Sequence, residues 1–375
     1  MSDVYNIYND EVLLFGEKQA RWYQIAAVHG VERALENGRR RVLLEMPTGS
    51  GKTFTSGLIF SSERIRKAVN VPSDEPLRLL FIAHKHRLLT QAEREYARAV
   101  NVEFIPQSVF QRIPRELVER GWHISVIDEA HHESCLSIQY QLETIGDLPI
   151  IGMTATPDRA DGCLIKFEEI INPISRQQAV DEGYLASTYI NSFVDTSGRV
   201  KTSLLKDIID HYAHEMGQTI VFTMTRREAQ DVYQHLTKRG YTARIILNQS
   251  DSELDNLLDD FSAGHFQFVV NCNKINEGVD VKQCSDVLLG RQYGSYPQLN
   301  QVIGRASRPD TPCNVWELVN PLSGRNLDTT VVVGTPERHR LIAKQGGQWV
   351  EREFDYVGQT RSEIIPRSEV IQRVN

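Results

Sequence analysis

Residues 46–53 read Met-Pro-Thr-Gly-Ser-Gly-Lys-Thr, and this short stretch decides the fold class. The apolar run Arg41-Val-Leu-Leu-Glu-Met46 precedes it as a buried strand would, and residues 54–67 after it are typical of a helix. A strand, a glycine-rich turn and a helix start aim backbone N–H groups and the positive end of the helix dipole at an anion. The sequence therefore predicts a phosphate-binding loop, in which Lys52 reaches the β- and γ-phosphates of a nucleotide and Thr53 holds Mg²⁺.

Strand-like runs alternate with helical patterns twice along the chain. In the first half we expect strands at 41–46, 77–83, 123–128 and 149–153, and helices at 86–99 and 134–145. In the second half we expect strands at 218–223, 242–247, 267–271 and 287–290, and helices at 226–239, 252–263 and 297–307. Strands separated by helices of this length indicate parallel sheets covered on both faces. The predicted fold class is α/β, with two tandem parallel-sheet domains.

The domain boundaries follow from where this alternation stops. Apolar periodicity lapses over Ser187–Val200, so we place the first domain at 1–190 and the second at 191–325. Residues 326–375 carry little regular pattern and are expected to form a short C-terminal extension.

Composition excludes several classes of protein. Of the 375 residues, 41% are hydrophobic and 24% are charged, as in an ordinary globular protein. No apolar run approaches the roughly 20 residues that span a bilayer, and no secretory signal is visible, so we expect a cytoplasmic protein and no membrane partner. The five cysteines show no C-x-x-C spacing, which argues against a zinc site or a disulfide framework. The net charge of −7 argues against a globally basic nucleic-acid surface but allows a local binding track.

A second informative element is Val126-Ile-Asp-Glu-Ala-His131. The apolar residues predict a strand whose carboxyl end carries Asp128 and Glu129, and ligands of such folds bind at that edge of the sheet. A pair of this kind often begins a capped helix instead. Downstream of a phosphate loop, however, Asp128 is suited to hold Mg²⁺ and Glu129 to orient and deprotonate an attacking water.

The motifs in this order resemble superfamily 2 helicases and translocases of the D-E-A-H type. The phosphate loop and Asp-Glu-Ala-His are followed by Met153-Thr-Ala-Thr156, by Asn276-Glu-Gly-Val-Asp280, which resembles the fifth motif of that family, and by Gln301-x-x-Gly-Arg-x-x-Arg308, which resembles the sixth. Arg21-Trp-Tyr-Gln24 is similar to the adenine-reading segment of the branch that includes XPB, RadD and the phage helicase UvsW. The resemblance covers about residues 20 to 310.

The resemblance implies two RecA-like domains with ATP, as Mg²⁺-ATP, bound in the cleft between them. It assigns nucleotide binding to Arg21, Gln24, Thr48, Gly49, Ser50, Gly51, Lys52, Thr53, Gly278 and Asp280. It assigns catalysis to Lys52, Asp128, Glu129, Gln301, Arg305 and Arg308, the last two as arginine fingers. It implies that nucleotide state is coupled to the nucleic-acid groove by His131, Thr154 and Thr156.

Candidate nucleic-acid contacts lie at the starts of helices and in loops. His84, Lys85 and Arg87 are placed at the turn into a helix, where cations meet phosphates. Further candidates are Gln107, Thr223, Arg226 and Asn273, the last because Cys272 occupies a place where relatives carry a hydroxyl.

We therefore expect an ATP-dependent DNA helicase or translocase, whose partner is single-stranded, forked or branched DNA. The alternatives are an RNA helicase, a duplex translocase of a restriction or repair complex that does not separate strands, and a nucleotide-gated nucleic-acid clamp. If the source is a phage, the expected location is the host cytoplasm.

Overall fold

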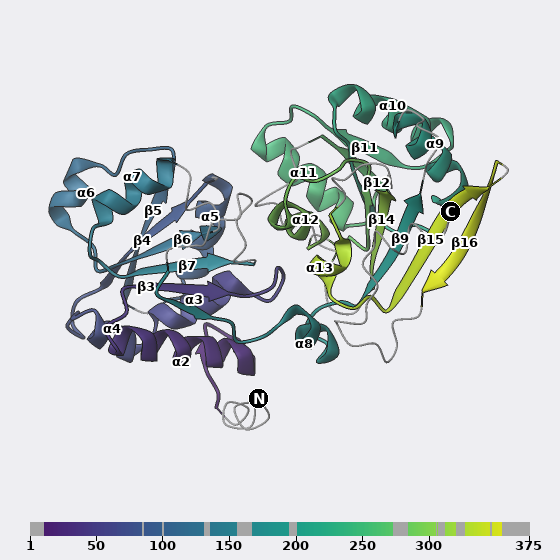
Figure 1. Ribbon diagram of the computed structural model, residues 1–375. Coiled ribbons are helices and arrows are strands. Elements are labelled where there is room, and N and C mark those ends of the chain that lie inside the picture. The colour runs from purple at the N-terminus through teal and green to yellow at the C-terminus, as the bar shows by residue number, and fades with distance from the viewer. Residues whose placement is uncertain are drawn as a thin grey trace. The chain divides into compact units, whose positions relative to one another are not determined.

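The computed structural model describes residues 11–84, 86–99, 101–130, 136–155, 167–194, 201–272, 284–304, 306, 312–319, 327–345 and 347–354. The chain divides into two compact units, Met1–Ser175 and Arg176–Asn375. Each unit is built around a sheet whose strands are mostly parallel, with helices packed against it (Figure 1). The two RecA-like domains predicted from the sequence agree with this architecture.

The first sheet has the strand order β5-β4-β6-β7-β3-β8, and its described pairs are all parallel. Its strands are β3 (Arg41–Glu45), β4 (Leu77–Ala83), β5 (Val102–Ser108), β6 (Ile124–Asp128), β7 (Ile150–Thr154) and β8 (Glu169–Ile171). A two-stranded hairpin, β1 (Leu14–Phe15) and β2 (Lys18–Gln19), precedes them. The four strands expected in this half are confirmed. β5 was not expected from the sequence. It contains Pro106, and a strand at the edge of a sheet tolerates a proline.

The helices of the first unit are α2 (Trp22–Glu36), α3 (Lys52–Phe60), α4 (Glu63–Ala68), α5 (His86–Tyr96), α6 (Arg115–Arg120) and α7 (Leu136–Ile145). The single helix expected over 54–67 is wrong, since α3 ends at Phe60 and α4 begins at Glu63. The Ser62 hydroxyl accepts hydrogen bonds from the backbone N–H groups of Arg64 and Ile65, and this cap starts a new helix.

The second sheet has the strand order β11-β12-β10-β13-β14-β9-β15-β16, parallel except for the last pair. Its strands are β9 (Thr188–Val194), β10 (Thr219–Phe222), β11 (Ala243–Ile246), β12 (Phe268–Asn271), β13 (Asp286–Leu289), β14 (Cys313–Val319), β15 (Arg338–Gln345) and β16 (Gln348–Phe354). Its helices are α8 (Arg176–Asp181), α9 (Lys201–Tyr212), α10 (Arg226–Lys238), α11 (Asp251–Ser262), α12 (Tyr296–Ile303) and α13 (Thr329–Val333).

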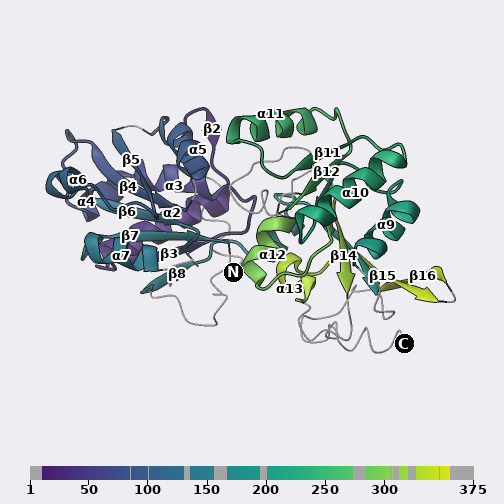
Figure 2. The same ribbon diagram turned by 90° about the horizontal axis from the view of Figure 1, so that it is seen from above.

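Both faces of the second sheet are buried. Along β10, Ile220 and Phe222 pack into one apolar cluster while Val221 packs into another on the opposite face. Figure 2 shows α9 and α10 on one side of this sheet and α12 and α13 on the other. Helices on both faces are what the near-continuous apolar strands predict. In the described part of the chain, no helix is long and apolar enough to cross a membrane.

Two predicted boundaries differ from the structure. A division between residues 190 and 191 falls inside β9, which is an interior strand of the second sheet between β14 and β15, and the units divide at Ser175 instead. The extension expected at 326–375 is, over its described residues, part of the second unit, because β15 and β16 form the edge of that sheet (Figure 1).

Candidate nucleotide-binding site

The predicted site residues of the first unit lie at the carboxyl edge of its sheet. β3 runs into the phosphate loop, β6 ends at Asp128, and β7 lies between these strands and ends at Thr154. The Thr154 carbonyl accepts a hydrogen bond of 3.0 Å from the backbone N–H of Met46, where the loop begins. Parallel pairing therefore brings Thr154 and Asp128 to the same edge as Lys52, as the sequence predicts.

The phosphate loop leaves the start of α3 without a side-chain cap. Gly49 and Gly51 both have φ of 88°, in the left-handed region that glycine adopts readily, and Gly51 is the N-cap residue of α3. The Ser50 hydroxyl donates to the Pro47 carbonyl at 2.7 Å, so that side chain stabilises the loop and does not cap the helix. The first N–H groups of α3 are thus arranged to receive an anion.

Lys52 and Thr53 occupy the first turn of α3. The Lys52 ammonium donates to the Met46 carbonyl at 3.2 Å, which holds the side chain along the loop. Its positive charge also lies near enough to Asp128 to favour the ionised carboxylate and so lower the pKa of that group. A lysine in this position is suited to move from a carbonyl to a phosphate oxygen.

Asp128 and Glu129 are adjacent acidic residues in an unfavourable electrostatic and backbone environment. Burial and the neighbouring charge of Glu129 together raise the pKa of Asp128 to about 7, against the opposing effect of Lys52. Glu129 has φ of 53°, which is uncommon for a residue other than glycine, and its backbone N–H donates to Asp128 Oδ1 at 3.0 Å. Backbone strain and a strongly shifted carboxyl pKa together point to a functional site.

The first turn of α2 contacts the phosphate loop directly. Gln24 Nε2 donates to the Ser50 carbonyl at 3.1 Å, and its Oε1 accepts the backbone N–H of Arg21 at 2.9 Å. Tyr23, which is fully buried, donates its hydroxyl to the same Ser50 carbonyl at 2.9 Å and accepts a hydrogen bond from Arg21 Nη1 at 3.0 Å. Tyr23 was not among the site residues expected from the sequence. A buried tyrosine usually finds a hydrogen-bond partner for its hydroxyl, but the burial of Tyr23 is known only from the fold.

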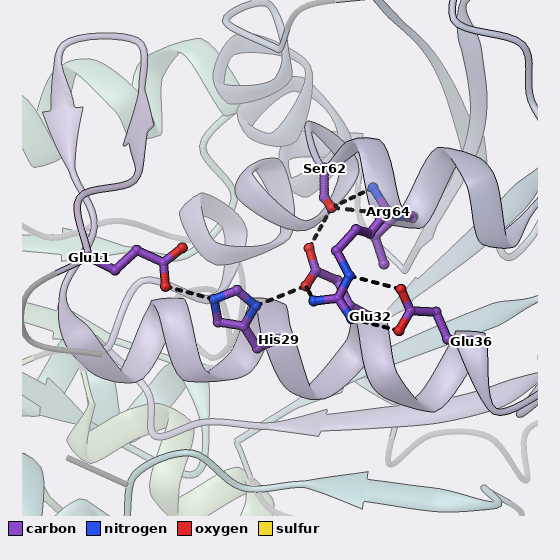
Figure 3. Close-up of polar contacts among 7 residues, drawn as sticks. Glu11, His29, Glu32, Glu36, Ser62 and Arg64 are labelled. Carbon is purple, nitrogen blue, oxygen red and sulfur yellow. Dashed lines mark hydrogen bonds and ion pairs between the residues drawn. The ribbon is translucent and has the colours of Figure 1, made fainter. Parts of the chain in front are cut away.

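A polar network fixes α2 against the start of α4 (Figure 3). His29 lies between two carboxylates, with Nε2 2.8 Å from Glu11 and Nδ1 2.9 Å from Glu32. Glu32 also accepts hydrogen bonds from the Ser62 hydroxyl at 2.5 Å and from Arg64 at 2.7 Å. The network holds in place the helix whose first turn supports the phosphate loop.

Two side chains that were predicted to contact nucleic acid form hydrogen bonds within the protein. Gln107 is buried, and its amide donates to the carbonyls of Ser108 at 2.9 Å and Gln111 at 2.7 Å. Thr223 is also buried, and its hydroxyl donates to the Asn271 carbonyl at 3.1 Å. In this structure both side chains stabilise the loops that carry them.

The remaining predicted site residues, for nucleic acid, nucleotide, coupling and catalysis, are only partly described. His84 is half-buried at the end of β4, Arg226 is exposed at the start of α10, and Gln301 is buried in α12. Arg87 lies in α5, and its side chain is outside the described set. Also outside the described residues are Lys85, His131, Thr156, Asn273, Gly278, Asp280, Arg305 and Arg308.

The donors at the site fit a magnesium ion bound together with phosphates. Thr53 and Asp128 offer a hydroxyl and a carboxylate, and Mg²⁺ prefers oxygen ligands, of which the protein usually supplies one or two. Within the described ranges, no group of three or more His, Cys, Asp or Glu residues could hold a metal by itself. A magnesium ion at this edge would complete its shell with phosphate oxygens and water.

Comparisons with known proteins find helicase-type regions in both units. The family model "Type III restriction enzyme, res subunit" matches residues 17–113, and "Helicase conserved C-terminal domain" matches residues 200–310. A curated relative from Schizosaccharomyces pombe, provisionally assigned as the mitochondrial ATP-dependent helicase irc3, is 24% identical over 338 residues, which is 77% of this chain and 55% of the relative. The chain spans about half the length of the curated relatives it matches.

Two solved structures share the fold. A fragment provisionally assigned as the HsdR subunit of a type I restriction enzyme from Vibrio vulnificus has a TM-score of 0.67 and 21% identity, covering 88% of this chain and 70% of that one. The ATP-dependent Type ISP restriction-modification enzyme LlaBIII, solved bound to DNA, also has a TM-score of 0.67, with 16% identity over 90% of this chain and 32% of that one. The two family models and the named relatives thus support a helicase-type enzyme of superfamily 2 that is similar to Irc3 in sequence and shares its fold with the HsdR fragment.

Proposed function

We propose that the protein hydrolyses Mg²⁺-ATP and uses the reaction to move along or remodel DNA. The observation that carries this proposal is the start of α3, which has no side-chain cap and lies on the same sheet edge as Asp128 and Glu129. Backbone N–H groups there would bind the phosphates, and Lys52 would leave the Met46 carbonyl for the β- and γ-phosphate oxygens.

The acidic pair would divide the work of hydrolysis. Thr53 and Asp128 would hold Mg²⁺, which when bound neutralises charge on the phosphates. Glu129 would orient the attacking water and accept its proton. Gln24 would read the adenine edge, with Arg21 beside it, once its amide exchanges the Ser50 carbonyl for the base.

Residues of the second unit would complete the reaction and couple it to movement. Gln301, Arg305 and Arg308 match the sixth motif of the family, and arginine fingers can contribute ~10³–10⁵-fold in rate. Nucleic-acid phosphates would be contacted by His84, Lys85, Arg87, Arg226 and Asn273. The DNA-bound state of LlaBIII supports DNA as the track. Arg21-Trp-Tyr-Gln24 supports the finer placement near XPB, RadD and UvsW, and Asp128-Glu-Ala-His131 supports the D-E-A-H type.

A second candidate is a motor of a restriction complex that moves on duplex DNA without separating its strands. The likeness to an HsdR fragment and to LlaBIII favours this reading. The two candidates share the ATP site and differ only in what the movement does to the duplex.

The test is steady-state ATP hydrolysis, alone and with single-stranded DNA, duplex DNA, forked DNA and RNA, using Glu129→Gln as the blank. We expect strong stimulation by one form of DNA and none in the blank. Stimulation by RNA alone would overturn the choice of DNA. Hydrolysis that persists in Glu129→Gln would overturn the assigned site.

Strand separation on a fork and displacement of a triplex-forming strand then distinguish the candidates. A helicase does both, a duplex translocase displaces only the third strand, and a nucleotide-gated clamp does neither.

A further inference from the structure

One aromatic side chain of the first unit is exposed to a degree that packing does not explain. Phe110 is 73% exposed, the highest value among the large hydrophobic residues that are exposed in the described part of the chain. It lies in the turn that follows β5, at the carboxyl edge of the sheet. Single exposed apolar residues are common on proteins, so its meaning depends on how it is held.

The turn that carries Phe110 is held from within by two glutamines. Gln107 donates its amide to the carbonyls of Ser108 and Gln111, at 2.9 and 2.7 Å. Gln141, from α7, donates to the same Gln111 carbonyl at 2.7 Å. Both glutamines are buried, and their amide N–H groups donate to carbonyls of the turn, which restrains its backbone.

Two apolar residues near Phe110 in the chain are buried instead of exposed. Val109 and Ile113 are buried in the apolar cluster under α7, and the Val109 N–H donates to the Ala83 carbonyl at 3.1 Å. Phe110 is therefore displayed by an anchored turn, and its ring would be ordered before any ligand arrives. Such pre-organisation lowers the entropy lost on binding.

One aromatic ring lies against the displayed ring, and a cation follows it two residues along the chain. The His84 ring lies 6.1 Å from the Phe110 ring, centre to centre, and meets it edge-on at 76°. The guanidinium of Arg112, two residues further on, lies 5.5 Å from the centre of the Tyr140 ring, and Tyr140 is 41% exposed. Exposed rings interleaved with cations are the composition of a surface that binds unpaired bases and their phosphates.

We propose that Phe110 stacks on an unpaired base of single-stranded nucleic acid, with His84 supporting the ring and Arg112 beside the adjoining phosphates. The inference rests on the proposed function and deepens it, since it names a single strand as the ligand of this edge. It also reassigns Gln107, which holds the turn while Phe110 makes the contact. The turn lies at the same sheet edge as the phosphate loop, where ligands of such folds bind, and the exposed aromatic ring favours a base as the occupant.

The test measures binding of two strands of equal length and charge, an oligo-dT strand and the same strand with abasic sites throughout, by fluorescence anisotropy at fixed salt. Phe110→Ala should weaken binding of oligo-dT by about 5- to 150-fold, which corresponds to ~1–3 kcal/mol for a stacked base. Phe110→Trp should restore it. On the abasic strand, wild type and Phe110→Ala should bind alike.

The matched control is Val118→Ala, which trims another exposed apolar side chain, on α6 of the same unit. It should leave both affinities unchanged. Because Phe110 is exposed, Phe110→Ala should keep the melting temperature of wild type, and this is checked by circular dichroism.

Three results would overturn the inference. The first is equal oligo-dT affinity of wild type and Phe110→Ala, and the second is an equal loss on both strands, which would make the contact independent of bases. In either case the ATPase proposal stands if wild-type hydrolysis responds to DNA. The third is a wild type that binds neither strand and hydrolyses ATP at a rate that no nucleic acid changes, and this would overturn the proposed function as well.

Discussion

The starts of α3 and α10 allow a comparison between the two units, because in each case a parallel strand is followed by a turn and a helix. At α3 the N-cap residue is Gly51, which offers no side chain to the first N–H groups. At α10 the N-cap residue is Thr225, whose hydroxyl accepts the Glu228 N–H at 3.1 Å. In return, the Glu228 carboxylate accepts the N–H groups of Thr225 and Met224, each at 3.0 Å.

The comparison teaches that topology alone does not make an anion site. Both turns follow a strand of a RecA-like sheet, but the negative charge at α10 is supplied by the protein's own carboxylate in a capping box. At α3 that place is left for a ligand, and two left-handed glycines shape the loop around it.

The largest expected effect comes from removing the positive charge of Lys52 at the start of α3. Lys52→Ala should lower ATP turnover by about 10²- to 10³-fold, since removing one electrostatic contact to the transition state has that effect in other enzymes. The measurement is steady-state hydrolysis at saturating ATP. Lys238→Ala, which removes an exposed lysine from the last turn of α10, is the control and should leave turnover unchanged.

A pair of glycine substitutions separates the effect of backbone strain on stability from the effect of a substitution on nucleotide binding. Gly51 and Gly240 share φ of 88°, but a Cβ on Gly51 would lie 2.8 Å from Gln24 Nε2, whereas a Cβ on Gly240 would meet nothing within 4 Å. Each change to Ala should lower the free energy of unfolding by ~1–2 kcal/mol. Gly51→Ala alone should weaken nucleotide binding, by about tenfold, because the added Cβ would displace the Gln24 amide that is proposed to bind the adenine edge.

Those two quantities come from denaturant unfolding and from titration with a fluorescent ATP analogue. Equal nucleotide affinity in the two variants would mean that the position of the Gln24 amide beside the loop does not affect nucleotide binding.

A pair of tyrosine substitutions sharpens the comparison further. Tyr23→Phe removes the hydroxyl that donates to the Ser50 carbonyl, and Tyr96→Phe removes an equally buried hydroxyl that donates to Ser56 within the same unit. Both should lower stability by a similar amount. Only Tyr23→Phe should raise the Kd for ATP, by about 2- to 12-fold, as expected for one neutral hydrogen bond.

A useful additional readout is base selectivity. Tyr23→Phe should weaken ATP and GTP binding alike, because it acts on the loop, while Gln24→Ala should reduce the preference for ATP. Loss of selectivity in Tyr23→Phe would assign the tyrosine to the base and not to the loop.

The smallest expected effect is a pH dependence of stability that comes from His123 in the first unit. Burial, and then the charge of Arg78, lower the pKa of His123 in the first unit, where the His123 ring accepts the Arg78 N–H at 3.0 Å. The folded protein therefore binds the proton less readily than the unfolded chain, whose histidines titrate near 6.5. The stability contributed by neutral His123 is present above pH ~6.5 and is lost as pH falls through the lower, folded value.

The measurement is denaturant unfolding at pH 7.5 and pH 5 for wild type and His123→Asn, whose amide oxygen can still accept the Arg78 N–H. Wild type should lose more stability than the variant over this interval, because all other titrating groups are shared. Equal losses would show that His123 does not sense pH.

Much of the fold was predictable because its signals are local. β4 was expected at its observed bounds, Leu77–Ala83, since an apolar run between polar turns marks a buried strand whatever surrounds it. The glycine turn and Lys52 were equally clear, because residue type and spacing define a phosphate loop within eight positions. The break between α3 and α4 was missed, although Ser62 at its N-cap was a visible local signal.

Other features were not predictable because they depend on distant partners. Asn191 and Ser192 interrupt the apolar pattern of β9 and led to a domain boundary being placed there. In the fold, Asn191 accepts a hydrogen bond from Arg340 at 2.6 Å, and Ser192 donates to Glu317 at 2.6 Å. Polar residues in an interior strand are tolerated only when such partners exist.

The sequence by itself therefore determined the chemistry of the phosphate loop, the acidic pair and the alternation of strands and helices, because these depend on residues that are close along the chain. Only the tertiary structure decided that Tyr23 supports Ser50, that Gln107 faces inward while Phe110 faces solvent, and that β9 belongs to the second sheet. Each of these outcomes depends on which side chains and strands meet after folding, and the order of residues along the chain does not specify those contacts one by one.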